Sequence, residues 1–176
     1  MRAVIAAVVG VERPLPQLDR YQIERQVGAG GMGVVYLGRE VATGRPVAIK
    51  TIEAAAGMER ARFAREAAVL RALRCPGVCG YLDDGTAPGG QPYLVMEWID
   101  GEDLASRLRR GPLDVTAALQ LGLAVARTLV AVHAAGVVHR DVKPSNVMLV
   151  GARLDDVRVI DFGVARGGAA AARLTA

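Results

Sequence analysis

The chain has 176 residues, 52% of them apolar, which is enough for one large domain or two small lobes around a buried core. Its formal net charge is +4, but the basic residues are spread along the chain and only 4% of residues are aromatic, which disfavours a nucleic-acid-binding surface. The two cysteines, Cys75 and Cys79, lack the second pair that a metal site needs, so we expect small buried side chains in a reducing compartment.

The first 18 residues are predicted to form an extension that precedes the folded part of the chain. Residues 1–10 are apolar behind a single arginine, but this run is too short to span a bilayer. The prolines at positions 14 and 16 read as a linker that ends the extension. We therefore expect an extension over residues 1–18, a first lobe over 19–97 and a second lobe over 98–176.

Three segments rich in β-branched and aromatic residues follow the extension. They predict strands over residues 21–27, 34–40 and 46–52. The turn over residues 42–45 places Gly44 where a positive φ is required, which is typical of a hairpin. The glycine-rich segment before residue 34 is therefore expected to join two antiparallel strands.

The rest of the chain shows helical and strand patterns in turn. We expect helices over residues 58–73, 103–110 and 115–135, and strands over 78–82, 93–98, 147–150 and 157–160. Asp114 is a candidate N-cap of the long helix and Gly136 its C-terminal glycine. Arg127 interrupts the apolar run of that helix, so we expect no membrane-spanning segment. Strands first and helices later indicate an α+β fold with two lobes.

Lysine and asparagine are almost absent from the chain. The only lysines are Lys50 and Lys143, and the only asparagine is Asn146, so their chemistry is expected to be needed there. Lys50 ends the apolar strand V-A-I-K, where the alternative is an exposed lysine at a sheet edge. Glu66, on the helix predicted over residues 58–73, is a candidate ion-pair partner that orients Lys50.

The glycines at positions 28, 30 and 33 form a G-x-G-x-x-G pattern. This pattern fits a dinucleotide-binding fingerprint or a phosphate-covering loop, and a simple tight turn is the plainer alternative. A dinucleotide fingerprint opens a helix, whereas Gly33 is followed by V-V-Y-L, which prefers a strand. Main chain without side chains can approach phosphate oxygens closely and donate N–H groups to them.

Four motifs occur in order: G-x-G-x-x-G-x-V, V-A-I-K, H-R-D-V-K-P-S-N and D-F-G. Together they resemble a eukaryotic-type protein kinase over residues 21–166, of the serine/threonine type and the bacterial branch. The resemblance implies a two-lobed protein-kinase-like fold with a complete β-rich N-lobe and a truncated helical C-lobe. Because no A-P-E segment follows, we expect the N-terminal portion of a kinase domain, with poor transfer activity on its own.

The resemblance implies a nucleotide site for ATP. Lys50, held by Glu66, would contact the α- and β-phosphates. The cofactor-binding positions that it implies are Gly28, Gly30, Gly33, Val35, Ala48, Lys50, Glu97, Ile99, Asp103 and Met148. The glycines would cover the phosphates and Asp103 would reach the ribose. The adenine would be surrounded by Val35, Ala48, Glu97, Ile99 and Met148.

The resemblance also implies catalytic and metal-binding residues. Asp141 would accept the proton of the substrate hydroxyl, and Lys143 would steady the γ-phosphate. Asn146 and Asp161 would hold Mg²⁺ through hard oxygen ligands. His139 would pack within a hydrophobic spine that also includes Leu70, Tyr81 and Phe162.

The partners implied by the resemblance are ATP and a protein substrate with a serine or threonine acceptor, with no nucleic acid and no membrane segment. The expected location is the cytoplasm. The alternative function is a catalytically inactive nucleotide-binding or interaction module. The intact Asp141, Asn146 and Asp161 argue against that alternative.

Overall fold

A computed structural model describes residues 16–30, 33–52 and 57–162 of the chain. The chain divides into two compact units, a first one up to Phe63 with Leu82–Trp98 added, and a second one made of Ala64–Tyr81 and the chain from Ile99 onward. Most of the predicted extension and the residues from Gly163 onward lie outside the described residues. The predicted lobe boundaries stay predictions.

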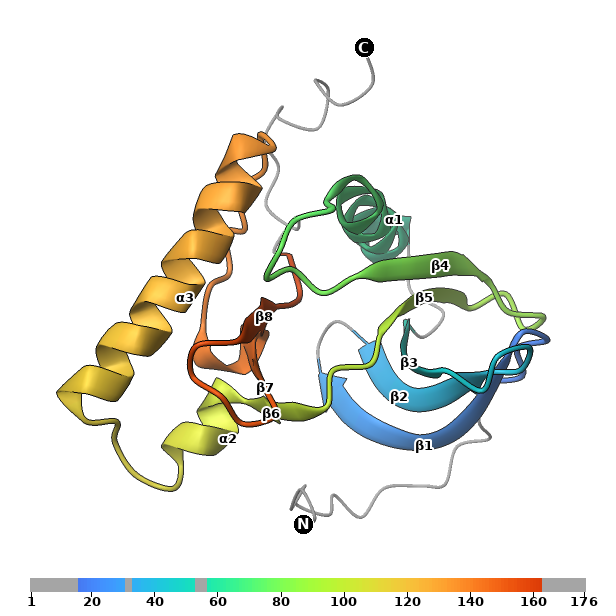
Figure 1. Ribbon diagram of the computed structural model, residues 1–176. Helices are drawn as coiled ribbons and strands as arrows, with labels where there is room; N and C mark the ends of the chain where they lie inside the picture. The colour runs from blue at the N-terminus through green and yellow to red at the C-terminus, as the bar shows by residue number, and fades with distance from the viewer. Residues whose placement is uncertain (1–15, 31–32, 53–56, 163–176) are drawn as a thin grey trace. The chain divides into compact units, whose positions relative to one another are not determined.

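The first unit is built on a five-stranded sheet (Figure 1). Its strand order is β1-β2-β3-β5-β4, and β2 pairs antiparallel with both β1 and β3, as β3 does with β5. The strands are β1 (Tyr21–Gly30), β2 (Gly33–Glu40), β3 (Pro46–Thr51), β4 (Tyr81–Thr86) and β5 (Pro92–Glu97). The three predicted N-terminal strands and the hairpin are confirmed, and Gly44 has a φ of 70°.

The sheet buries one face in a core cluster, because strand residues alternate between its two faces. The cluster contains Tyr21, Tyr36, Val47, Ile49 and Val95. The alternate residues on β3, Ala48 and Lys50, therefore lie on the other face. This alternation separates the residues that hold the sheet together from those that are candidates for a site.

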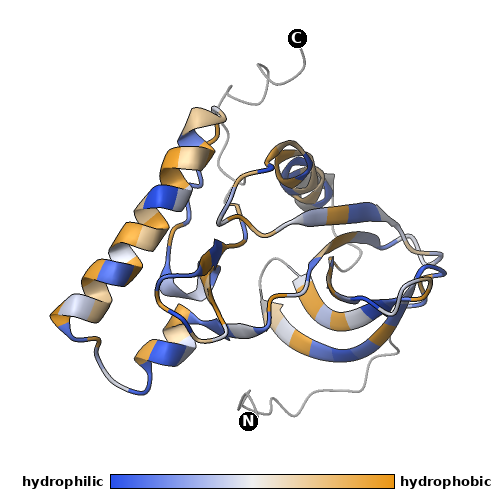
Figure 2. Cartoon of the chain, in the orientation of Figure 1, coloured by the Kyte–Doolittle hydropathy of each residue, from blue (hydrophilic) through white to orange (hydrophobic). Residues whose placement is uncertain are grey.

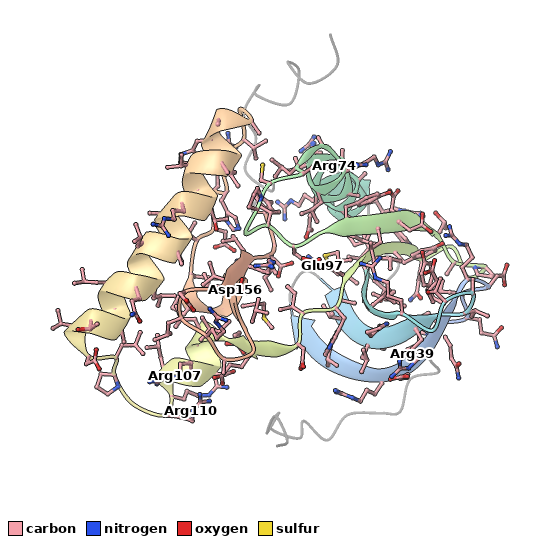
Figure 3. All side chains as sticks on the ribbon, in the orientation of Figure 1. Arg39, Arg74, Glu97, Arg107, Arg110 and Asp156 are labelled. Atoms are coloured by element: carbon pink, nitrogen blue, oxygen red, sulfur yellow. The ribbon has the colours of Figure 1, made fainter. Side chains whose placement is uncertain are left out.

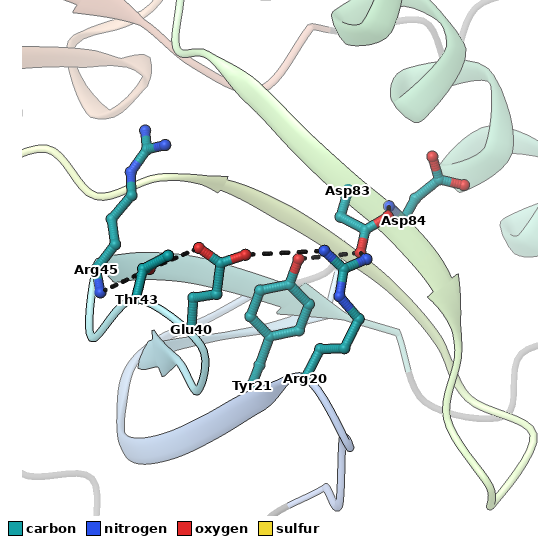
Figure 4. A network of polar contacts seen from close by, with 7 residues as sticks. All are labelled: Arg20, Tyr21, Glu40, Thr43, Arg45, Asp83 and Asp84. Carbon is teal, nitrogen blue, oxygen red and sulfur yellow. Dashed lines mark hydrogen bonds and ion pairs between the residues drawn. The ribbon is translucent and has the colours of Figure 1, made fainter.

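A polar network joins the two edge strands of this sheet (Figure 4). Asp83 on β4 accepts a hydrogen bond from the Tyr21 hydroxyl at 2.9 Å and one from the Arg20 guanidinium at 2.7 Å. Burial and the bond to Asp83 raise the pKa of Tyr21 to about 12. Arg20 also lies 3.7 Å from Glu40, which accepts a hydrogen bond from Thr43 in the β2–β3 turn. The network thus ties together β1, the hairpin and β4.

The second unit is built around a small sheet and a long helix. The sheet order is β6-β7-β8, with β6 (Gly101–Asp103), β7 (Val147–Val150) and β8 (Val157–Val159) all antiparallel. The helices are α1 (Gly57–Ala72), which begins in the first unit, α2 (Leu104–Leu108), α3 (Val115–Ala134) and the 3-10 helix η1 (Pro144–Asn146). The core cluster packs α2 and α3 on the sheet through Leu104, Leu121, Val147, Leu149 and Val157. β6 was not predicted from the sequence.

α3 begins and ends as its sequence predicts. Asp114 caps its first turn by accepting a hydrogen bond from the Ala117 N–H at 2.8 Å, and Gly136 follows its end with a φ of 75°. Apolar residues run along the whole helix, as Figure 2 shows, and its length and composition would allow it to cross a membrane. That is weak evidence for a membrane span, because core helices of soluble proteins pass the same test.

The strand predicted over residues 78–82 is wrong in its position. Val78 forms only an isolated bridge with Val159, and the Cys79 N–H donates to the Val159 carbonyl at 3.1 Å. β4 begins at Tyr81 instead and runs through Asp83, a residue type that usually avoids strands. Val78 and Cys79, which the sequence pattern placed in this strand, therefore bond to β8 instead.

The connection before Val78 is packed tightly against α3. Gly77 has a φ of 81°, and a Cβ at that position would lie 2.0 Å from the Thr128 hydroxyl oxygen. The Gly77 carbonyl accepts a hydrogen bond from the Val159 N–H at 2.7 Å. Both cysteines are free and lie in this region, with Cys79 buried and Cys75 half-buried.

Candidate active site

The sheet of the first unit brings several predicted nucleotide-binding residues onto one face. Val35 on β2 lies opposite Gly28 on β1 and opposite Lys50 on β3. Ala48, two residues before Lys50, lies on the same face and opposite Met96 on β5. The register therefore places the side chains of Val35, Ala48 and Lys50 on one face, next to Gly28, which has no side chain.

Lys50 is a buried lysine, with only 2% of its surface exposed. β3 lies between β2 and β5, so the alternative of an exposed lysine at a sheet edge is wrong. A buried ammonium group needs partners that compensate for its lost hydration. At this position the ammonium group is compensated by bound partners and not by water.

The glycines of the G-x-G-x-x-G pattern have different surroundings. Gly30 forms the last pair of the β1–β2 ladder with Gly33. At Gly33, φ is 117° and a Cβ would lie 2.0 Å from the Thr51 carbonyl oxygen, whereas a Cβ at Gly28 would meet nothing within 4 Å. Gly33 is therefore required by the fold, and Gly28 leaves open space above the sheet.

The second unit brings Asp141, Lys143 and Asn146 together in the loop before β7, whereas the other two predicted catalytic residues, Lys50 and Glu66, lie on β3 and α1. The Asp141 carboxylate accepts hydrogen bonds from the Lys143 ammonium at 2.7 Å and from the Asn146 amide at 3.0 Å. The same amide donates to the Asp141 carbonyl at 2.9 Å, which holds the loop in a closed arc. Lys143 and Asp141 are both partly exposed, so this group can meet a substrate from solvent.

These bonds set the charge state of the carboxylate. The hydrogen bond from Lys143 holds the pKa of Asp141 below its ordinary value, and the Asn146 amide acts in the same direction. Asp141 is therefore a carboxylate at neutral pH, with oxygen lone pairs available to a hydroxyl donor.

Of the two predicted magnesium ligands, Asn146 directly precedes β7 and Asp161 follows β8, the strand paired with β7. The Ile160 N–H donates to the Asn146 carbonyl at 3.0 Å, and Asp161 is the next residue. Asn146 is buried, and Asp161 has a φ of 53°, in the left-handed region. Among the described residues no group of three or more His, Cys, Asp or Glu side chains could hold a metal by itself. One amide and one carboxylate oxygen fit Mg²⁺ bound together with phosphate oxygens and water.

His139 connects this loop to the end of β8. Its Nδ1 accepts a hydrogen bond from the Asp141 N–H at 3.2 Å, so the neutral ring donates from Nε2 to the Ile160 carbonyl at 2.9 Å. The ring is buried and lies 4.5 Å from the Phe162 ring, centroid to centroid. His139 is thus a packing residue that positions Asp141 through its main chain.

The neutral state of His139 predicts a pH dependence of stability. Burial lowers its pKa, and the hydrogen bond to the Ile160 carbonyl and the nearby carboxylates of Asp141 and Asp161 oppose this only in part. The unfolded chain takes up the proton near pH 6.5 while the folded chain does not, so stability is present above that pH and is lost as the pH falls below it. We expect His139→Gln to flatten the fall in the free energy of unfolding between pH 7.5 and 5.5, measured with urea.

The size of the effect is at most about 1.4 kcal/mol for each pH unit below the ordinary histidine value. His133→Gln is the control, because His133 is exposed on α3 and should leave the pH dependence as in the wild type. Equal pH dependence in wild type and His139→Gln would show that the ring does not carry this proton linkage.

Two predicted nucleotide-binding residues lie on neighbouring strands of the second unit. Asp103 on β6 is paired with Met148 on β7. The Asp103 carboxylate also caps α2, since it accepts hydrogen bonds from the Ser106 N–H at 2.8 Å and from the Ser106 hydroxyl. Ser106 was missed from the sequence, although Asp103, three residues before it, is a residue type favoured at helix N-caps.

The remaining predicted residues are Glu66, Glu97 and Ile99. Glu66 is buried on α1, Glu97 ends β5 and Ile99 follows in the connection to β6. The ion pair of Glu66 with Lys50 stays a prediction, as do the adenine contacts of Glu97 and Ile99.

A comparison with known protein families supports the interpretation of the residues described in the two units. The family model of the protein kinase domain matches residues 21–175. The chain belongs to the protein kinase family, and its α+β fold is that of this family.

Relatives of the chain include bacterial serine/threonine-protein kinases. The chain is 44% identical over 152 residues to serine/threonine-protein kinase pkn2 of Myxococcus xanthus, a match that covers 84% of this chain and 18% of that protein. It is 36% identical over 155 residues to serine/threonine-protein kinase PknB of Mycobacterium leprae, covering 84% of this chain and 25% of that protein. The chain therefore spans about a fifth to a quarter of the length of these relatives.

Proposed function

We propose that the chain carries the ATP-binding and phosphoryl-transfer residues of a serine/threonine protein kinase. The observation that carries this proposal is the Asp141 carboxylate, held by Lys143 and Asn146 and partly open to solvent. Such a group can accept a proton from a hydroxyl while a cation beside it binds the transferred phosphoryl group.

In the proposed reaction, a serine or threonine hydroxyl of a protein attacks the γ-phosphorus of ATP. The new oxygen–phosphorus bond forms as the bond to the β–γ bridging oxygen breaks, and ADP leaves. The Asp141 carboxylate takes the hydroxyl proton. Lys143, 2.7 Å from that carboxylate, lies where it can compensate the negative charge of the transferred group.

The other polar residues supply binding and charge compensation. Lys50 would bind phosphate oxygens, with Gly28 leaving the main chain of β1 open to them. Asn146 and Asp161 would hold Mg²⁺, which when bound neutralises phosphate charge. Asp103 and Met148 would contact the ribose and the adenine.

The serine/threonine assignment rests on the D-V-K-P-S-N loop and on the names of the relatives. We further propose a cytoplasmic location for this part of the protein, where ATP and protein substrates are available. A nucleotide-binding module without transfer activity is the second candidate, and the intact Asp141, Asn146 and Asp161 favour the first.

Binding of Mg²⁺-ATP by the 176-residue chain, measured by isothermal titration calorimetry, tests the proposed site. We expect Lys50→Met to weaken binding by about 10- to 100-fold, because a charge-assisted hydrogen bond to phosphate is lost. Arg45→Met is the control, because Arg45 is exposed in the β2–β3 turn and should bind like the wild type.

A wild-type chain that binds no ATP would contradict the proposal. Equal affinities for the wild type and Lys50→Met would remove Lys50 from the site. Because the 176 residues alone are expected to transfer poorly, the two candidates are separated in a longer chain that includes an A-P-E segment, where ATP binding without any transfer to a generic basic protein would favour the module without transfer activity.

A further inference from the structure

The start of α2 holds a chain of three polar groups that ends on the predicted ribose-binding carboxylate. The Arg109 guanidinium donates to the Ser106 hydroxyl oxygen at 2.8 Å. That hydroxyl donates in turn to one oxygen of the Asp103 carboxylate, while the Ser106 N–H donates to the other oxygen at 2.8 Å. Both carboxylate oxygens are therefore fixed by one residue.

The two hydrogen bonds from Ser106 to the Asp103 carboxylate exceed what a helix cap requires. A single bond from a main-chain N–H satisfies the capping requirement of α2. The torsion of an aspartate carboxylate about its last bond is broad, so one bond leaves the second oxygen free to move. The Ser106 hydroxyl removes that freedom at Asp103.

The carboxylate keeps room for a ligand while it is held. An ionised carboxylate has about four acceptor sites, and Ser106 uses two of them. Two sites remain for donors such as the two hydroxyls of a ribose. Asp103 is half-buried at the end of β6 beside Met148, so the free sites lie next to the predicted adenine contact.

Arg109 is the arginine of this segment that bonds to Ser106. Arg107 donates to the Gly111 carbonyl at 3.2 Å, and Arg110 forms a two-bond ion pair with Glu102. Figure 3 shows Arg107 and Arg110 at this end of the second unit. A cation that donates to a hydroxyl oxygen makes that hydroxyl a stronger donor, which strengthens its bond to Asp103.

We propose that Ser106, supported by Arg109, is a positioning residue that fixes the Asp103 carboxylate for the two hydroxyls of the nucleotide ribose. The inference rests on the proposed ATP-binding function and deepens it. It predicts that Ser106 contributes to affinity only when the ligand has ribose hydroxyls.

The test compares the binding of Mg²⁺-ATP and of Mg²⁺-2′,3′-dideoxy-ATP, which lacks both hydroxyls, by isothermal titration calorimetry. We expect Ser106→Ala to weaken ATP binding about fivefold, as for the loss of one net hydrogen bond, and to leave dideoxy-ATP binding unchanged. Ser106→Thr keeps the hydroxyl and should restore the preference for ATP.

Arg109→Ala provides a second variant that leaves the serine and the cap of α2 in place. It should reduce the preference for ATP over dideoxy-ATP, whereas Arg110→Ala, the matched control, should not. Equal weakening of both ligands by Ser106→Ala would mean a merely structural role and would overturn the inference.

Two further outcomes separate the inference from the function on which it rests. A wild-type chain that binds ATP and dideoxy-ATP equally well would overturn the role of Ser106 and leave ATP binding intact. A wild-type chain that binds neither ligand would overturn both.

Discussion

Asp141→Asn is expected to reduce the rate of phosphoryl transfer by about 10²- to 10⁴-fold, the usual contribution of a general base. The amide has nearly the shape of the carboxylate but cannot take the proton of the substrate hydroxyl. The bond from the Asn146 amide to the main-chain carbonyl at position 141 does not involve the carboxylate and should remain. The measurement is the rate of ³²P transfer from ATP to protein at saturating ATP, made in a longer chain that includes an A-P-E segment, because the 176 residues alone are expected to transfer poorly.

ATP binding should survive this substitution, because the proposed nucleotide contacts lie at other residues. Asp155→Asn is the matched control, since Asp155 is an exposed aspartate of the same unit that pairs with Arg153. A rate for Asp141→Asn within threefold of the control would exclude Asp141 as the proton acceptor.

Gly33→Ala is expected to destabilise the first unit by on the order of 3 kcal/mol or more. A Cβ at this position would lie 2.0 Å from the Thr51 carbonyl oxygen, and the φ of 117° is one that alanine rarely adopts. The β2–β3 ladder would have to shift to make room. Urea unfolding followed by circular dichroism measures the loss.

In the same motif, Gly28→Ala is expected to change the affinity for ATP but not the stability of the fold. Nothing lies within 4 Å of a Cβ at Gly28, so the unfolding midpoint should stay close to that of the wild type. The affinity for Mg²⁺-ATP should fall, because the added methyl group occupies space proposed for phosphate. If Gly33→Ala were as stable as Gly28→Ala, the close approach of β2 to Thr51 would be refuted.

Local sequence pattern predicted the three N-terminal strands because their contacts are close in sequence. The β2–β3 hairpin is specified by alternation and by Gly44, which needs a positive φ. β4 was misplaced because its position depends on distant partners. Val78 bridges to Val159, and Asp83 is accepted in a strand because Arg20 and Tyr21 bond to it.

The site shows the same division between local and distant contacts. Asp141, Lys143 and Asn146 lie within six residues, so their grouping could be expected from the motif, and the structure brings them together. The bond of His139 to the Ile160 carbonyl joins residues 21 positions apart and could not be predicted from pattern. Ser106 was missed because its significance depends on where β6 places Asp103.

The polar bonds between β1 and β4 have a consequence for how the first unit opens. These strands stand at the two ends of the strand order, yet Tyr21 and Arg20 from one side bond to Asp83 on the other. Fraying of either margin therefore breaks bonds at both, so the two margins should open as one cooperative unit. In native-state hydrogen exchange, the amides of β1 and β4 should lose protection together, although 62 positions separate Tyr21 from Asp83 in the chain.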